Sequence, residues 1–336
     1  MNKLVNLAGV DHTIGYADEI FGFPRIDDAF RSASIFPMLC ELSEFVPERD
    51  RAYVFRKDHI KAFQIWAHGA EKNILLQGET GTGKTSLIEQ VAARLNWPVY
   101  AIGCHGGLEF QELIGRVTLQ SDGSTGWADG PLIAAMRIGG IFLLDEMNFL
   151  KPEVAGGLNT VLQASVYTIP ETGELIKANP AFRIAATGNA IDGVGKGSYR
   201  GTQSTNIALL SRFTLGIRVK YMSVQDEVSM IKGKAPGISE KVAEYLAEIA
   251  DMARKSHSEG VLKSPMSPRE TIASARRAVA NSGASTGADA LQAQCKGMSL
   301  AFEMSFLFRW NPDDRGEFVK ASNSVAIRLG LPITLE

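Results

Sequence analysis

The sequence predicts an α/β fold in which a parallel five-stranded sheet, covered by helices, precedes an all-helical domain. Strand and helix signals alternate from about residue 71 to residue 222, and such alternation favours a parallel sheet. A glycine-rich turn joins the first strand of this region to its first helix. From about residue 223 onward the apolar residues follow helical spacing alone, which predicts the second domain.

The first 70 residues are expected to form an N-terminal extension. Short apolar clusters are interrupted there by prolines, and the region ends in a predicted helix that carries Ile60, Phe63 and Trp66 on one face. Asp58 is the expected cap of that helix. The extension is therefore predicted to lead directly into the sheet.

The region 71–222 is expected to be the large α/β domain, and the region 223–336 a helical lid domain. The strands are expected near 73–77, 98–102, 141–144, 183–187 and 214–219, and the helices near 84–96, 131–138, 151–164 and 205–212. Beyond residue 223, helices are expected around 242–252, 271–280 and 290–308. The segment 298–308, rich in Met, Phe and Leu, is expected to lie in the core.

Composition indicates a soluble globular protein. The 336 residues are 45% apolar and 21% charged with a formal net charge of -2, and no apolar run reaches the ~18 to 20 residues that a membrane helix needs. Near-neutral charge favours neither a nucleic-acid nor a membrane partner. The three cysteines are scattered and no signal segment is apparent, so we expect a cytoplasmic location. The histidines are isolated and are expected at surface or half-buried positions.

The strongest motif is a phosphate-binding loop that fits G-x-x-x-x-G-K-[ST] at every fixed position. Glycines let its backbone N-H groups turn toward phosphate oxygens at a helix N-terminus. Lys84 is expected to reach the outer phosphates, and the Thr85 hydroxyl to bind magnesium. A glycine-rich turn with a surface lysine is the alternative, but the flanking strand and helix favour ATP and Mg²⁺. The nucleotide-binding residues are Gly78, Glu79, Thr80, Gly81, Thr82, Gly83, Lys84, Thr85 and Ser86.

An acidic pair, Asp145-Glu146, follows the apolar strand Ile141 to Leu144. Asp145 is expected to bind the nucleotide's magnesium together with Thr85, and Glu146 to deprotonate the attacking water. An acidic pair after a strand is also a common helix cap, and a helix does begin near Pro152. Its place downstream of the phosphate loop favours the catalytic interpretation.

Three further polar residues are candidates for the same site. Asn189 follows the strand 183–187, at the edge where parallel sheets bind ligands, and is expected to position the water or sense the γ-phosphate. Arg212 is a candidate arginine finger, and Arg269 is a candidate nucleotide contact from the second domain. The alternatives are a turn-forming asparagine and an arginine that caps a helix.

In this order the motifs resemble the AAA+ ATPases, and specifically their MoxR branch. The segments 112–116 and 129–132 look like those that bracket that branch's helix-2 insertion, and 167–176 looks like its hairpin before the first sensor. Trp127 in the insertion is either a client-facing residue at a ring centre or a buried hairpin anchor. The resemblance implies a hexameric ring in which Arg212, with Arg200 as a weaker second candidate, acts on the neighbouring subunit's nucleotide.

Within the branch, the chain is most similar to the ATPase subunits of aerobic cobalt-inserting chelatases. The similarity runs through 45–50, 88–98, 179–183 and 199–203, whereas 103–110 differs and Ser211 stands where relatives usually carry an acid. A chelatase role implies a von Willebrand A partner and a large chelatase subunit. The alternatives are an activase or maturation chaperone with a von Willebrand A partner, a nucleic-acid-linked AAA+ motor, and a nucleotide-gated scaffold.

Overall fold

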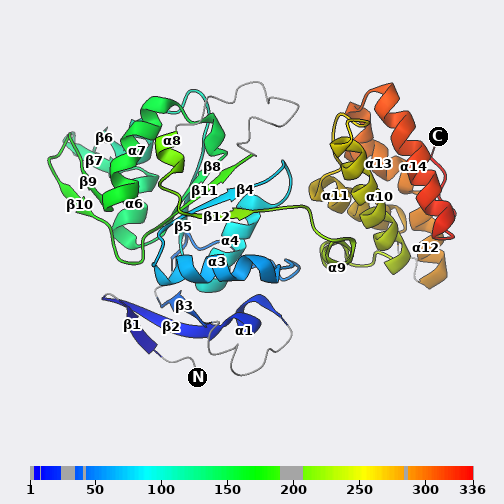
Figure 1. Ribbon diagram of the computed structural model, residues 1–336, viewed down its shortest axis with the longest axis horizontal. Coiled ribbons are helices and arrows are strands. Elements are labelled where there is room, and N and C mark those ends of the chain that lie inside the picture. Colours follow the sequence, from blue (N-terminus) through cyan, green and yellow to red (C-terminus); the bar gives the residue numbers. More distant parts are fainter. Residues whose placement is uncertain are drawn as a thin grey trace. The chain divides into compact units, whose positions relative to one another are not determined.

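The computed structural model describes residues 4–7, 9–23, 35–40, 43–189, 207–283 and 287–335, which form two compact units (Figure 1). The first unit holds most of the chain up to Val219. The second holds Lys220–Glu336 together with two short segments, Arg51–Val54 and Thr80–Gly83.

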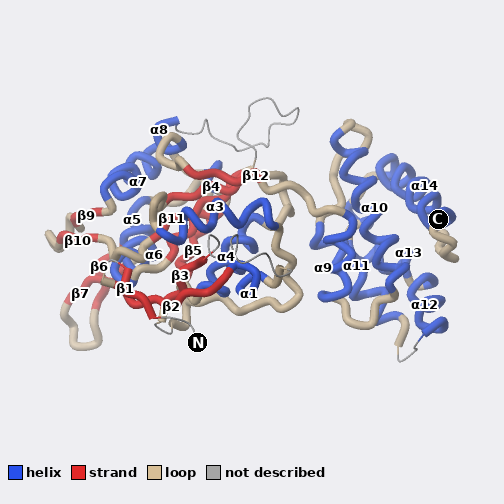
Figure 2. The backbone as a smooth tube through the Cα atoms, turned by 60° about the horizontal axis from the view of Figure 1, so that its bottom comes forward, coloured by secondary structure: helices blue, strands red, loops and turns tan. Residues whose placement is uncertain are grey.

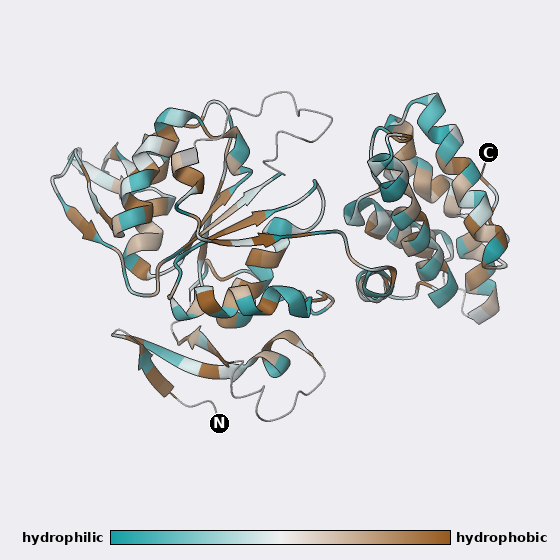
Figure 3. Cartoon of the chain, viewed as in Figure 1, coloured by the Kyte–Doolittle hydropathy of each residue, from teal (hydrophilic) through white to brown (hydrophobic). Residues whose placement is uncertain are grey.

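A five-stranded parallel sheet organises the first unit, as the sequence predicted. Its strands lie in the spatial order β12 (Leu215–Arg218), β4 (Asn73–Gln77), β11 (Arg183–Gly188), β8 (Ile141–Asp145) and β5 (Val99–Gly103). The strands are short and almost wholly apolar because both faces are covered. Figure 3 shows this apolar character along the strands.

Helices cover both faces of this sheet. α3 (Lys57–His68) and α4 (Lys84–Leu95) lie on one side, and α6 (Pro131–Ile138) and α7 (Pro152–Ala164) on the other (Figures 1 and 2). Alternate strand residues serve the two sides: Phe142 and Leu144 of β8 pack with α6 and α7, in a core cluster that also holds Leu158 and Phe182. The short helices α5 (Phe110–Ile114), η1 (Met147–Phe149) and α8 (Ile207–Leu210) also belong to this unit.

Two antiparallel hairpins extend from the sheet domain, at the insertion and before β11. β6 (Gly115–Leu119) pairs with β7 (Thr125–Asp129), and β9 (Val166–Thr168) pairs with β10 (Leu175–Lys177). Arg137 of α6 joins them, since it donates to Asp129 of the first hairpin and to Glu174 beside the second. Trp127 is half-buried against the core cluster of α6 and α7, which agrees with the hairpin-anchor alternative.

The N-terminal region contains a sheet that the sequence analysis did not predict. β1 (Leu4–Leu7), β2 (Val10–Tyr16) and β3 (Ile35–Leu39) form an antiparallel sheet. The short helix α1 (Ala17–Phe21) directly follows β2 in the chain. β3 contacts α3 and α4 of the large sheet domain. The expected cap of α3 was wrong: the helix begins at Lys57 after Arg56, so that Asp58 lies in its first turn.

Among the described residues of the second unit, every regular element is helical, which confirms the predicted all-helical architecture (Figure 2). These helices are α9 (Val224–Lys234), α10 (Glu240–Ser258), α11 (Pro268–Asn281), α12 (Gly287–Lys296), α13 (Met298–Ser305), η2 (Leu307–Arg309) and α14 (Pro312–Arg328). The rings of Tyr245, Phe302, Phe306 and Phe318 pack against one another in tilted and edge-to-face contacts in the core of the unit.

Two expectations about burial need correction. Segment 298–308 is core only in part: Leu300 and Met304, four residues apart on α13, are exposed, and so is Phe308 after the end of that helix. His12 and His59 are buried, not half-buried or on the surface, because β2 and α3 turn them inward. Among the described residues, no helix is both long and apolar enough to span a membrane.

Candidate nucleotide site

The carboxyl ends of three neighbouring strands bring most of the predicted site residues together. β4 leads into the phosphate loop, β8 ends at Asp145, and β11 ends at Gly188, just before Asn189. β11 lies between β4 and β8 and runs parallel to both. Because parallel strands end at the same edge of a sheet, these segments meet there.

The phosphate loop has the conformation that its glycines permit. Gly81 and Gly83 have φ angles of +81° and +86°, in the region that residues with a Cβ rarely adopt. Lys84, which opens α4, is buried and donates to the carbonyls of Gly78 and Glu79, both at 2.9 Å. The loop therefore holds a lysine cation beside the N-terminus of α4, where an anion is favoured. Ser86 follows as an exposed residue of the first turn.

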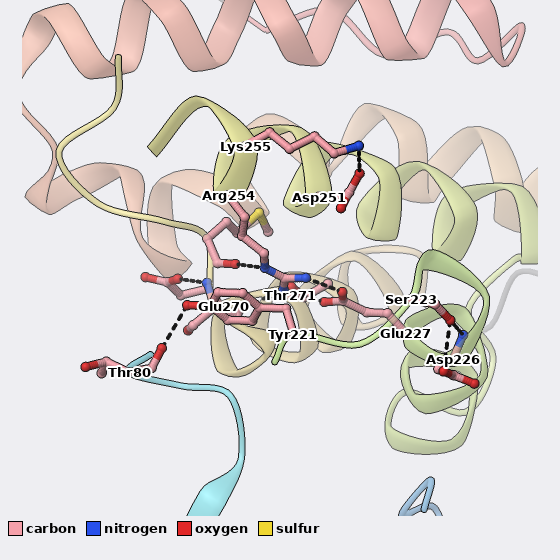
Figure 4. Close-up of polar contacts among 12 residues, drawn as sticks. Thr80, Tyr221, Ser223, Asp226, Glu227, Asp251, Arg254, Lys255, Glu270 and Thr271 are labelled. Carbon is pink, nitrogen blue, oxygen red and sulfur yellow. Dashed lines mark hydrogen bonds and ion pairs between the residues drawn. The ribbon is translucent and has the colours of Figure 1, made fainter. Parts of the chain in front are cut away.

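The turn Thr80–Gly83 groups with the helical unit. The Tyr221 hydroxyl donates to the Thr80 carbonyl at 2.9 Å, and the Arg254 guanidinium lies 4.4 Å from the Tyr221 ring centroid. Arg254 is itself held by a buried bidentate pair with Glu227 at 2.5 and 2.8 Å. Figure 4 shows this run of contacts from Thr80 to Glu227.

Arg269 lies in the first turn of α11, within that helical unit, and is exposed. Ser267 caps the helix in a capping box with Glu270. A Cβ on Gly81 would lie 2.8 Å from the Ser267 Cβ, so the loop turn approaches the start of α11 closely. Glycine at position 81 is therefore required both by its φ angle and by this approach.

Oxygen atoms around Asp145 fit a magnesium ion. The Thr85 hydroxyl donates to Asp145 Oδ1 at 2.7 Å, and the Thr187 hydroxyl donates to the same oxygen at 2.5 Å. Within the described part of the chain, no hydrogen bond reaches Asp145 Oδ2. Mg²⁺ prefers hard oxygen ligands and keeps several waters, so a hydroxyl beside a carboxylate with one uncommitted oxygen suits it.

Glu146 has a backbone conformation that is unusual for a residue with a side chain. Its φ and ψ of 58° and 45° are left-handed, which costs about 1–2 kcal/mol relative to the right-handed region. The Glu146 N-H donates to the Thr187 hydroxyl at 2.9 Å, and the carboxylate is exposed. The chain therefore leaves the direction of β8 at Glu146. Such sparsely populated backbone conformations cluster at functional sites.

The acidic pair perturbs its neighbours. Burial raises the pKa of Glu89, one helical turn after Thr85 on α4, and the charge of Asp145 adds to that rise. Burial also raises the pKa of the Cys104 thiol to about 12, with smaller contributions from the carboxylates of Asp145 and Glu146. Cys104 is therefore a neutral thiol at physiological pH, and a nucleophilic role is not indicated.

Asn189 contacts the phosphate loop directly. Its Oδ1 accepts from Lys84 Nζ at 3.1 Å, and its backbone N-H donates to Asn148 Oδ1 at 3.2 Å. Asn148 lies in η1, just after the acidic pair, and is 5% exposed. Its buried Nδ2 has no hydrogen-bond partner among the described residues. Asn148 thus ties the end of β11 to the segment that carries Glu146.

Arg212 lies apart from this cluster, just after α8. Its guanidinium donates to the Ala208 carbonyl, within one helical turn, and to Gln163 Oε1 of α7 at 3.4 Å. Its backbone carbonyl accepts from Asn73 Nδ2 at 3.0 Å, at the amino end of β4. Within one chain, Arg212 therefore belongs to the opposite end of the strand that leads into the phosphate loop.

Sequence reasoning missed Thr187 and Asn148. Thr187 on β11 contacts Asp145 and Glu146, and Asn148, just after that acidic pair, contacts Asn189 at the end of β11. These contacts depend on strand pairing rather than on residue spacing along the chain. A polar residue within an otherwise apolar buried strand was the available signal for Thr187, which is 0% exposed. Arg200 and the whole segment 199–203 lie outside the described residues.

Comparison with known proteins identifies the class. Residues 73–213 match the family described as AAA domain (dynein-related subfamily), so fold and site together define an AAA+ P-loop ATPase. The aerobic cobaltochelatase subunit CobS of Sinorhizobium sp is 30% identical over 290 residues, or 83% of this chain and 84% of CobS. The denitrification regulatory protein NirQ of Pseudomonas aeruginosa is 32% identical over 58% of this chain and 72% of NirQ.

The chain therefore belongs to the MoxR-type AAA+ ATPases, the family of CobS and NirQ. Among solved structures, the RuvB Holliday junction branch migration motor of Thermotoga maritima aligns with a TM-score of 0.49 and 15% identity, over 86% of each chain.

Proposed function

We propose that this protein hydrolyses ATP, with Mg²⁺, in a homo-hexameric ring that remodels or drives a partner complex. The observation that carries the proposal is the contact of the phosphate loop with the residues at the ends of β11 and β8. Lys84 reaches Asn189, and Thr85 reaches Asp145, through direct hydrogen bonds. Family membership supports the same assignment.

The phosphate loop and the helical unit would bind the nucleotide. The backbone N-H groups from Gly78 to Ser86 and the Lys84 cation would bind the phosphates. Lys84 donates to oxygens of Gly78, Glu79 and Asn189, and phosphate oxygens would replace some of these acceptors when the nucleotide binds. Arg269 would contact the nucleotide from the start of α11.

Thr85 and Asp145 would hold the magnesium ion, Thr85 through its hydroxyl and Asp145 through water. When bound, Mg²⁺ would neutralise the charge that develops on the transferring phosphoryl group. The protein's own contribution is to fix the two ligands before the ion arrives, because Thr85 and Asp145 are already hydrogen-bonded to each other.

Hydrolysis requires a base, a water-positioning group and a positive charge on the transferred phosphoryl group. Glu146 would accept the proton of the attacking water, and Asn189 would orient that water or sense the γ-phosphate. Arg212 would stabilise the transition state from the neighbouring subunit. Arg212 contacts Asn73 at the amino end of β4, whereas the phosphate loop of the same chain follows the carboxyl end of β4. This separation supports a role in trans.

For the client, we propose a chelatase complex that inserts cobalt in cobalamin synthesis, with a von Willebrand A partner and a large chelatase subunit in the cytoplasm. Similarity to CobS along most of both chains supports this choice. The similarity to NirQ favours a maturation chaperone as the second candidate. In either case ATP hydrolysis would be coupled to work on another protein.

Substitution of the proposed base tests the ATPase assignment. Glu146→Gln should retain ATP binding and lose about 10²- to 10⁴-fold in turnover, because general-base catalysis contributes that much. Steady-state phosphate release and binding of a fluorescent ATP analogue measure the two quantities. Glu153→Gln, which neutralises an exposed acid of α7, is the matched control. Undiminished hydrolysis by Glu146→Gln would remove Glu146 from its proposed role.

The same variant tests the client. With ATP held and not hydrolysed, Glu146→Gln should retain its partners when it is purified from the native host. Recovery of a von Willebrand A protein with a large chelatase subunit supports the chelatase role. Recovery of a von Willebrand A protein with a different enzyme favours the maturation chaperone, and recovery of nucleic acid contradicts both.

A further inference from the structure

Thr187 contacts both acids of the site at once. It lies on β11 two residues before Asn189, and its side chain is fully buried. Its hydroxyl is 2.5 Å from Asp145 Oδ1 and 2.9 Å from the Glu146 backbone nitrogen. The sequence analysis gave this residue no role.

The direction of these two hydrogen bonds follows from the chemistry of the groups. The Glu146 N-H can only donate, so the Thr187 oxygen accepts from it. The single hydroxyl proton is then available for Asp145, whose ionised carboxylate can only accept. One hydroxyl therefore fixes the Asp145 carboxylate and the Glu146 backbone together, and neither bond can be reversed while Asp145 is charged.

The two hydrogen bonds of Thr187 constrain the backbone conformation of Glu146 and the orientation of the Asp145 carboxylate. Glu146 has a left-handed backbone that a non-glycine residue adopts only when its surroundings hold it there. Asp145 receives hydrogen bonds on Oδ1 from Thr85 and Thr187, so that Oδ2 stays available at the sheet edge. Without the Thr187 hydroxyl, the Asp145 carboxylate would keep, among the described residues, the hydrogen bond from Thr85, and the Glu146 N-H would lose this acceptor.

We infer that Thr187 is a positioning residue of the ATPase site, which orients Asp145 toward magnesium and holds Glu146 in its left-handed conformation. The inference rests on the proposed function of these two acids. Thr187 does not itself touch nucleotide or metal in this assignment. Its hydroxyl, and not its methyl group, carries the effect.

The test compares Thr187→Val, which removes the hydroxyl at nearly constant shape, with Thr187→Ser, which retains it. In the nucleotide-free full chain, Thr187→Val should speed amide hydrogen exchange of the Glu146 segment about tenfold, since the Glu146 N-H loses its acceptor. The Mg²⁺ concentration for half-maximal binding of an ATP analogue should rise about 10- to 100-fold, and kcat should fall by a similar factor. Thr187→Ser should stay close to the wild type in all three measurements.

Two controls keep the result interpretable. Thr118→Val removes a half-buried hydroxyl from the β6–β7 hairpin, where it donates to the Gly126 carbonyl, and should leave all three measurements unchanged. If Thr187→Val does not fold, Thr187→Ala replaces it, with the same expected effects. Wild-type exchange and Mg²⁺ dependence in the hydroxyl-free variant would overturn the inference. Equal damage in Thr187→Ser would overturn it too, because the methyl group would then be responsible.

Failure of the proposed function has a different signature. A wild-type ring that binds Mg²⁺ and ATP without hydrolysis would overturn the ATPase assignment, and the Mg²⁺ and exchange comparisons would still decide the role of Thr187. A wild-type chain that binds no nucleotide would overturn both.

Discussion

At the scale of single residues, His59 shows how burial sets a protonation state. The Arg56 guanidinium lies 2.6 Å from His59 Nε2, and because a guanidinium can only donate, that nitrogen must be the acceptor of a neutral ring. Burial, followed by the charge of Arg56, lowers the pKa of His59 to about 4, against a smaller opposing effect of Asp58. The imidazole is therefore uncharged in the folded chain at neutral pH.

This lowered pKa predicts a loss of stability in acid. Between about pH 6.5 and pH 4 the unfolded chain binds a proton at His59 and the folded chain does not, so the stabilisation present above pH 6.5 is lost as the pH falls. The loss is about 3 kcal/mol over the whole window, since one pKa unit is about 1.36 kcal/mol. Urea unfolding of the wild type and of His59→Gln at several pH values measures the difference.

The control for this prediction is His105→Gln, which removes an exposed imidazole and should follow the wild-type pH dependence. Parallel curves for His59→Gln and the wild type between pH 6.5 and pH 4 would contradict the assignment. The difference between the curves isolates His59, because His12, whose pKa is also lowered by burial, titrates in both proteins.

At the scale of elements, one buried arginine joins the N-terminal helix α3 to the sheet. Arg183 begins β11 and donates to the carbonyls of Trp66 and Ala67 at the end of α3, at 2.7 and 2.8 Å. It also donates to Pro180 and Phe182, at 2.8 and 2.9 Å. The carbonyl end of a helix favours a cation, although burial lowers the pKa of this guanidinium to about 10.

Loss of this arginine should separate α3 from the sheet domain. Arg183→Met removes the side-chain donor from four backbone carbonyls, so we expect a loss of about 3 kcal/mol in the free energy of unfolding. Arg183→Lys should recover part of it, since a lysine can reach some of the same oxygens. Arg116→Met, at an exposed position of β6, is the control for urea unfolding. A loss no larger than that of the control would show that these contacts are not needed.

At the scale of the whole molecule, the position of Arg212 predicts an active site shared between subunits. Arg212→Ala should bind ATP normally and lose about 10³-fold in turnover, the usual effect of a missing arginine finger. Asp145→Asn should be inactive for a different reason. Mixed rings of the two variants should regain activity, because about a quarter of the interfaces in a random equimolar ring carry an intact Asp145 and an intact Arg212.

Phosphate release from mixtures at fixed total protein measures this recovery. Arg328→Ala, which removes an exposed arginine of α14 that pairs with Glu248, should behave as the wild type alone and in mixtures. Mixtures no more active than their separate components would contradict action in trans. So would a chain that stays monomeric with ATP at physiological concentration.

The strands of the large sheet could be predicted from the sequence because their signals are local. Each is a short apolar run bounded by turn residues, and the glycine-rich loop fixes the first of them and the helix that follows. The small sheet β1–β2–β3 escaped prediction, since β2 and β3 are separated by a long connection and no local pattern pairs them. The predicted cap of α3, Asp58, lies two residues after the observed cap, Arg56. The sequence could not distinguish the two positions, because an aspartate is as suitable inside the first turn of a helix as before it.

The sequence by itself determined the fold class, the family and the residue types that the nucleotide site needs, because a phosphate loop is a contiguous segment whose backbone carries the chemistry. Only the tertiary structure decided how those residues are held. Strand order places β11 between β4 and β8, and this brings Thr187 to Asp145 and Glu146, and Asn148 to Asn189. Contacts between strands that are 40 residues or so apart in the chain have no local signature, since the side chains meet only after the sheet has formed.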